Sequence, residues 1–285
     1  MNAISPVFDA DQNDTVHISI NLNSYSLLYS DYLLLIASTV RNLRKSGITV
    51  NGNFIDFNAN PNRSNYASRI NFFEHIGFNF DENFNRQNAT GRFTEIKAFD
   101  QDNALDLHRE IMTILINNGV NDDMLVVLNY CLWEVLDNTL NHSGEGFTYG
   151  AGSGYVCAQY FPYKQEVRIM IADNGIGIHQ ALTTHPKSEY KNYSEQEAVL
   201  HCIDRGVTNS EGMGFGLWAT SKMMKENGGE LTIHSGNHQL SCQNSKSIIE
   251  TTKWKGTYTY LKINTDIAVN HEVIFGENST QRDDF

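Results

Sequence analysis

The sequence is short of positive charge. Lys and Arg number 21 against 33 Asp and Glu, which gives a formal net charge of −12. This balance opposes the neutralisation of phosphates that nucleic-acid binding requires, and no local run of Lys and Arg offsets it. Anionic membrane surfaces are disfavoured for the same reason. We therefore expect neither nucleic acid nor membrane among the direct partners.

Long apolar runs and paired cysteines are also missing. The longest apolar stretch, residues 32–40, is far shorter than the ~20 residues that cross a bilayer. Residues 1–15 are polar and acidic rather than signal-like, so we expect a cytoplasmic protein. The cysteines form no CxxC pair, which predicts reduced thiols rather than a zinc site or a disulfide framework. They are Cys131, Cys157, Cys202 and Cys242.

What remains is an ordinary globular composition in a chain long enough for two modest domains. Hydrophobic residues make up 40% and charged residues 19% of the 285 residues. Asn and Asp are frequent in residues 81–102, which indicates a linker, although residues 93–99 could form a strand across the junction. We predict domains at 1–95 and 96–285, with the core of the second at about 105–265.

The first domain shows a β-α-β-α pattern. Hydrophobic periodicity and a stop at Gly47 predict the order strand, helix, strand, loop, helix at residues 16–22, 30–45, 48–57, 58–65 and 66–76. This order resembles a shortened STAS-like domain, the fold of anti-sigma-factor antagonists, with residues 71–78 similar to its closing helix. That resemblance implies a protein partner. Ser24, Ser26 and Ser30 lie where such domains carry a phosphoacceptor, but they fit turn and cap positions better.

A strong amphipathic helix is predicted at residues 122–142. Opposite its apolar positions, Glu134, Asn138 and Asn141 recur at steps of four and three and so project from one side. An Asn carbonyl can supply an oxygen ligand to Mg²⁺ beside a carboxylate base one turn away. Alone, the pattern would equally describe a solvated helix face.

Two glycine-containing turns follow. Predicted strands at 155–161 and 166–172 lead into Asp173-Asn174-Gly175-Ile176-Gly177, where the carboxylate could accept from the amino group of adenine. A common strand-ending turn would look the same. Further on, residues 212–217 read Gly-Met-Gly-Phe-Gly-Leu before a predicted helix at 218–227. This is a phosphate cradle at a helix N-terminus, without the Lys of a P-loop.

These motifs, with Gly256-Thr257 after them, occur in one order across residues 105–265 and together resemble the GHKL superfamily of gyrase B-type topoisomerases, heat-shock chaperone ATPases, histidine kinases and MutL. The resemblance implies an α/β fold, an α+β sandwich whose mixed sheet is covered by helices, with ATP and Mg²⁺ as ligands. It makes Glu134 the general base and Asn138 the metal ligand. It assigns ATP binding to Asn138, Asp173, Gly175, Gly177, Gly212, Gly214, Gly216, Leu217 and Thr257.

Residues 179–211 occupy the position of the family's ATP lid, with a predicted helix at 194–205. Such a lid would be ordered by nucleotide and mobile without it. Arg205 and Lys187 could reach phosphates from there, although ordinary surface charges are the commoner explanation.

The branch of the superfamily stays open. No histidine box matches, since His108 lacks its flanking residues, and the chain ends soon after Ile263, which disfavours a DNA-gating transducer. We expect an Mg-ATP-binding switch, an ATPase coupled to partner regulation. Two alternatives remain open: a Ser/Thr protein kinase resembling the anti-sigma factors, and a non-catalytic ATP-dependent interaction module. A homodimer is also possible.

Overall fold

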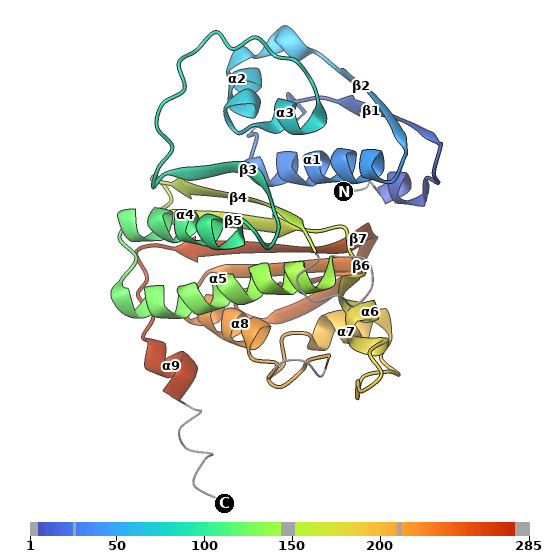
Figure 1. Ribbon diagram of the computed structural model, residues 1–285. Coiled ribbons are helices and arrows are strands. Elements are labelled where there is room, and N and C mark those ends of the chain that lie inside the picture. The colour runs from blue at the N-terminus through green and yellow to red at the C-terminus, as the bar shows by residue number, and fades with distance from the viewer. Residues whose placement is uncertain (1–4, 25–26, 144–151, 210–212, 277–285) are drawn as a thin grey trace, which may run out of the picture.

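A small unit precedes the main sheet. In the computed structural model, which describes residues 5–24, 27–143, 152–209 and 213–276, this unit has two parallel strands that pair with each other, and one long helix lies beside them (Figure 1). Its elements are η1 (Ser5–Asp9), β1 (Thr15–Ile20), α1 (Ser30–Lys45), β2 (Thr49–Phe54), η2 (Phe57–Ala59), α2 (Pro61–Arg69) and α3 (Phe72–Ile76). The predicted β-α-β-α order is confirmed, and α1 has the predicted bounds.

Two predictions for residues 58–76 were wrong. A loop was expected over residues 58–65, but Pro61 stands at the first position of α2, where its fixed φ suits a helix start. The single helix expected over 66–76 is interrupted at Asn71, whose φ of 64° is left-handed. Two short helices result.

The second unit is a five-stranded sheet with helices. The strands are β3 (Phe93–Phe99), β4 (Gly154–Phe161), β5 (Glu166–Ala172), β6 (Glu230–Cys242) and β7 (Lys246–Asn264). Their order is β3-β4-β5-β7-β6 and every pair is antiparallel, so among the described residues parallel pairing occurs only between β1 and β2. The proposed domain boundary near residue 95 falls within β3.

The helices of this unit lie on one face of the sheet (Figure 1). They are α4 (Ala104–Asn117), α5 (Asp122–His142), α8 (Gly216–Glu226) and α9 (His271–Phe275), with α6 (Gly177–Thr183) and α7 (Glu195–His201) towards one end. The bounds of α5 and β5 are those predicted. No described helix is long and apolar enough to cross a membrane.

The two faces of the sheet belong to two hydrophobic cores. Strand residues alternate in direction, so Ile169 and Ile171 of β5 pack with α5 and α8, whereas Met170 and Ala172 face α1. Leu33 and Leu34 of α1 are buried in that second core. The N-terminal unit therefore forms a third layer, on the outer face of the sheet.

Candidate functional site

A cavity of about 320 Å³ lies between α5, the end of β5, the middle of β7, α6 and the start of α8. It brings together eight of the ten residues assigned to catalysis or ATP binding, namely Glu134, Asn138, Asp173, Gly177, Gly214, Gly216, Leu217 and Thr257. Gly175 is not part of its wall, and Gly212 lies outside the described residues. Residues far apart in the chain thus form one concave site.

The α5 wall carries the polar side chains. Glu134, Asn138 and Asn141 all line the cavity, as their helical spacing predicts. Asp137 joins them, and Asn141 Nδ2 donates to Asp137 Oδ2 at 2.8 Å. These four oxygen-bearing side chains therefore lie at the cavity within about two turns of one helix.

Glu134 sits in surroundings that disfavour its charged form. Burial is the main cause that raises the pKa of its carboxyl, and the negative charge of Asp137 adds to the rise. The hydroxyl of Tyr130, one turn earlier, hydrogen-bonds the carboxylate and partly offsets these effects. Burial raises the pKa of the Tyr130 phenol to about 12, and the charge of Glu134 adds to the rise. Glu134 is therefore a stronger base than an exposed glutamate. Tyr130 was missed because a tyrosine one turn away has no sequence signal.

Gly216 begins α8 and lies directly against Glu134. A Cβ atom built on Gly216 would collide with Oε2 of Glu134 and would stand 2.8 Å from its Cβ and 2.9 Å from its Cγ. Only glycine lets the first turn of α8 approach the carboxylate this closely. The helix N-terminus, with its unpaired N–H groups, and the carboxylate therefore share one end of the cavity.

Asp173 lies at the end of β5 and is 6% exposed. Its Oδ1 accepts from the backbone N–H groups of Gly175 at 2.8 Å and Thr257 at 3.2 Å. Burial nevertheless raises the pKa of its carboxyl to about 7, because these two bonds only partly replace the lost water. Both bonds go to Oδ1, so within the described part of the chain Oδ2 is the oxygen left to accept from a ligand.

The backbone around Asp173 is held by a residue that the sequence did not suggest. The indole Nε1 of Trp254, a fully buried side chain, donates to the backbone carbonyl of Asp173 at 3.1 Å. On its other side the Trp254 ring meets the edge of Phe8 from η1, with centroids 5.3 Å apart. Trp254 thus connects the N-terminal segment to the Asp173 turn.

Gly175 is required for a different reason from the one expected. A Cβ at Gly175 would collide with the backbone carbonyl oxygen of His142 and with the Cα of Ser143, so the Asp173 loop packs directly against the end of α5. Gly256, at φ 88°, approaches from the opposite strand, and a Cβ there would lie 2.5 Å from Oδ1 of Asp173. The glycines around Asp173 therefore make room for backbone.

The segment predicted as a lid rests on the β6–β7 hairpin. α7 is shorter than expected and begins at a capping box, where Ser194 accepts from the backbone N–H of Glu197. Glu195 contacts His238 at 2.7 Å, and Asp204 contacts Lys246 at 2.8 Å.

The two basic residues considered for the lid differ in their surroundings. The guanidinium of Arg205 lies 5.4 Å and 5.3 Å from the ring centroids of Phe215 and Trp218, beside the start of α8. Lys187 is exposed and is not part of the cavity wall.

The family is shown by comparison with known proteins. Residues 125–266 match the model of the histidine kinase-, DNA gyrase B-, and HSP90-like ATPase family. The matched segment runs from α5 to the end of β7 and contains the whole cavity wall. This part of the chain belongs to that family, the GHKL ATPases, as its four motifs indicated, and it is an ATP-binding domain. No curated protein matches the chain.

Proposed function

We propose that the protein binds Mg-ATP in this cavity and cleaves the γ-phosphate bond, as an ATPase whose nucleotide state a partner protein reads. One observation carries the proposal: the carboxylate of Glu134 and the N-terminus of α8 adjoin at the same end of the cavity. A helix N-terminus binds phosphate, and a carboxylate with a raised pKa is a competent base.

The adenine end of the proposed site is Asp173. Its Oδ2 would accept from the exocyclic amino group, which adenine has and guanine lacks at that position. Thr257, whose N–H holds Oδ1, fixes the orientation of the carboxylate. The proposal therefore includes a preference for adenine nucleotides.

The donor set suits magnesium bound jointly with a triphosphate. The described residues hold no cluster of three or more His, Cys, Asp or Glu that could bind a metal alone. The amide oxygen of Asn138 and the nearby carboxylate of Glu134 are oxygen donors, and Mg²⁺ commonly takes one or two such groups plus substrate phosphates. Asn138 would hold the ion, which when bound neutralises charge on the phosphates.

In this mechanism the protein contributes position and one proton acceptor. The first turn of α8 and the preceding Gly214 orient the phosphates, while Glu134 accepts the proton of the attacking water. In a protein kinase the same carboxylate would accept the proton of a Ser or Thr hydroxyl. The kinase alternative is supported by the β-α-β-α unit, because its order resembles a shortened form of the fold of the anti-sigma-factor antagonists.

The protein partner is proposed to bind the N-terminal unit. Among the described residues, β1 and β2 pair only with each other, so each strand presents one edge. Strand edges are places where other chains add. Of the serines considered as phosphoacceptors, Ser26 lies outside the described residues. Ser30 is 8% exposed and hydrogen-bonded to Tyr66 and Cys157, which does not favour phosphorylation there.

ADP production by the purified protein tests the proposal. Glu134→Gln keeps the size and the hydrogen bond from Tyr130 but removes the base, so turnover should fall roughly 10²–10⁴-fold while ATP affinity stays nearly unchanged. Wild-type turnover in the Gln variant would remove the catalytic role. If wild type shows neither hydrolysis nor transfer to a partner, the protein is a non-catalytic ATP-binding module.

A matched binding experiment tests the magnesium assignment. Asn138→Ala should weaken the binding of Mg-ATP much more than that of ATP in excess EDTA, because the change removes a metal ligand and leaves the adenine contacts. Equal losses in the two conditions would place Asn138 outside the metal shell.

A further inference from the structure

A second cavity, of about 490 Å³, lies where the N-terminal unit meets the ends of β3 and β4. It shares no lining residue with the ATP cavity. Its walls are one face of α2, the loop between α3 and β3, and the β4 end of the sheet. Six side-chain amides line it, from Asn62, Asn65, Asn85, Gln87, Asn88 and Gln159.

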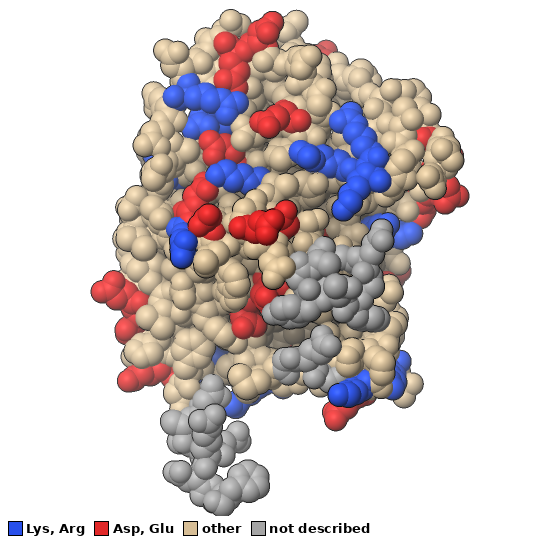
Figure 2. Space-filling model, viewed as in Figure 1, with Lys and Arg blue, Asp and Glu red and all other residues tan. Residues whose placement is uncertain are grey.

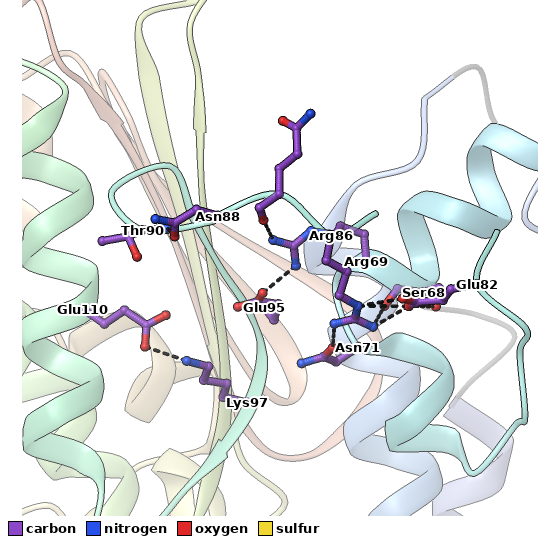
Figure 3. A network of polar contacts seen from close by, with 11 residues as sticks. Ser68, Arg69, Asn71, Glu82, Arg86, Asn88, Thr90, Glu95, Lys97 and Glu110 are labelled. Atoms are coloured by element: carbon purple, nitrogen blue, oxygen red, sulfur yellow. Dashed lines mark hydrogen bonds and ion pairs between the residues drawn. The ribbon is translucent and has the colours of Figure 1, made fainter. Parts of the chain in front are cut away.

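The loop that forms one wall is long, irregular and held in place. Residues 77–92 contain no helix or strand, yet Arg86 binds Glu82, Asn71 Oδ1 and the carbonyl of Ser68, each through its guanidinium (Figure 3). Arg69 of α2 donates to the carbonyl of Gln87 at 2.6 Å. Loops of this length without secondary structure are uncommon in compact domains, and are usually functional when ordered. The cavity is therefore preformed.

Contacts across the cavity join the two units. Tyr66 Oη donates to Gln159 Oε1 at 2.8 Å, and Arg69 pairs with Glu95 of β3 at 2.6 Å. The Arg69 guanidinium also lies 4.5 Å from the centroid of the Phe93 ring. A ligand in this cavity would thus touch the N-terminal unit and the ATPase sheet at once.

The charge of the cavity is opposite to that of the chain. No Asp or Glu lines it, although the chain carries a net charge of −12. The charge of Arg69 is matched by Glu95, and both side chains are only 16% exposed. Arg92 also lines the cavity, and within the described residues its exposed guanidinium makes no ion pair or hydrogen bond. In Figure 2 most Lys and Arg side chains on the visible face likewise lie over the N-terminal unit and its junction with the sheet.

From these features we propose that the second cavity binds a small anion bearing a flat, hydrogen-bonding ring, of the nucleoside monophosphate class. Arg92 would pair with the phosphate. The aromatic rings that line the cavity, Tyr66, Phe84, Phe93 and Tyr160, offer surfaces for stacking, and amide side chains pair with base edges through both donor and acceptor. The ligand would act at the junction between the units, apart from the ATP site.

Titration calorimetry on the full chain tests this site. AMP, GMP, CMP, UMP and inorganic phosphate are titrated into the Asp173→Asn variant, in which the adenine contact of the ATP cavity is impaired. At least one monophosphate should bind at one site per chain, and inorganic phosphate at least tenfold more weakly. Arg92→Ala should weaken the nucleotide at least tenfold. The matched control is Arg109→Ala, which removes an exposed arginine of α4 paired only with Asp106.

Three results would overturn the proposal. Failure of every monophosphate to bind at about 5 mM would remove the site. An equal effect of Arg92→Ala and Arg109→Ala would show only a general loss of charge. Equal binding of phosphate and nucleotides would contradict recognition of the ring. Because ATP hydrolysis by wild type is measured separately, none of these results depends on the function proposed for the first cavity.

Discussion

Glu134 on α5 and Gly216 at the start of α8 adjoin so closely that no side chain fits on the glycine. Two elements separated by 82 positions in the chain therefore set one distance, that between the proposed base and the phosphate-binding helix terminus. The glycine determines this distance through shape alone, since it has no group that could react. Its replacement is a test of geometry rather than of chemistry.

Gly216→Ala should lower the rate of ATP cleavage at least tenfold. The added methyl group must displace Glu134 or move α8, and small displacements of a catalytic group are costly. Steady-state ADP production measures the effect. Gly276→Ala is the control, because its φ is negative and, among the described residues, an added Cβ would lie near the Cβ of Glu272 at 3.8 Å, an ordinary contact distance. Equal rates in wild type and Gly216→Ala would mean that the packing seen here does not govern turnover.

Trp254→Phe should weaken ATP binding several-fold, although Trp254 is not part of the cavity wall. The change keeps an aromatic ring against Phe8 but removes the N–H group that holds the carbonyl of Asp173. Calorimetry with ATP and GTP distinguishes a misplaced Asp173 carboxylate from a general loss of stability. If Trp254 positions Asp173, the preference for ATP over GTP should be smaller in the variant. A variant that binds both nucleotides more weakly by the same factor would make Trp254 a purely structural residue.

Binding of an adenine nucleotide should release a proton near pH 6. The pKa of Asp173 is about 7 in the free protein, and the ionised carboxylate accepts from the amino group more strongly than the neutral acid does. Below pH 7 the affinity for adenosine, which lacks titrating phosphates, should fall by up to about tenfold per pH unit. Calorimetry in two buffers of different ionisation enthalpy counts the protons. Asp173→Asn should show a flat profile.

The same pKa fixes the sign of a stability effect. Because burial raises the folded-state pKa of Asp173 above its ordinary value of 3.8, the neutral form stabilises the fold at low pH, and this contribution is lost as the pH rises towards 7. The free energy of unfolding of wild type, measured in urea without nucleotide, should therefore fall between pH 4 and 7 relative to Asp173→Asn. A rise of wild type relative to the variant would contradict the burial argument.

Leu34→Ala should destabilise the whole protein by about 2–5 kcal/mol, the usual cost of a large-to-small change in a core. Leu34 is 0% exposed and packs in the core shared by α1 and the sheet. Since Trp133, Trp218 and Trp254 all lie in the second unit, their fluorescence should report one transition, with its midpoint lowered by this N-terminal change. Tyr32→Ala, at an exposed α1 position, is the control. An unchanged tryptophan transition in Leu34→Ala would mean that the two units unfold independently.

Local patterns predicted much of the fold, and the limits of prediction were set by contacts distant in sequence. The bounds of α5 and β5 follow from hydrophobic periodicity, and the helical spacing of Glu134 and Asn138 places both on the cavity wall. By contrast, the collision that makes Gly175 necessary involves the end of α5, some thirty positions away. No local pattern contains that information.

The packing of the N-terminal unit on the outer face of the sheet could not be predicted from the sequence either. A small β-α-β-α unit can be recognised from its periodicity, but the apolar residues of α1 look the same whether they face their own sheet or another one. The residues against which α1 packs include Met170 and Trp254, which belong to strands more than 100 positions further along the chain. The position of that unit therefore had to come from the structure.

Because α1 packs on a sheet completed only by β7, the N-terminal unit cannot finish folding when it leaves the ribosome. Roughly 190 residues separate the end of α3 from the end of β7, which corresponds to about 10–40 s of synthesis at ordinary rates. During this interval the leucines of α1 can pack against α3 and β2 but lack part of the sheet surface that buries them in the finished fold. The order of translation thus makes α1, which is synthesised before the sheet, among the last elements to be fully stabilised.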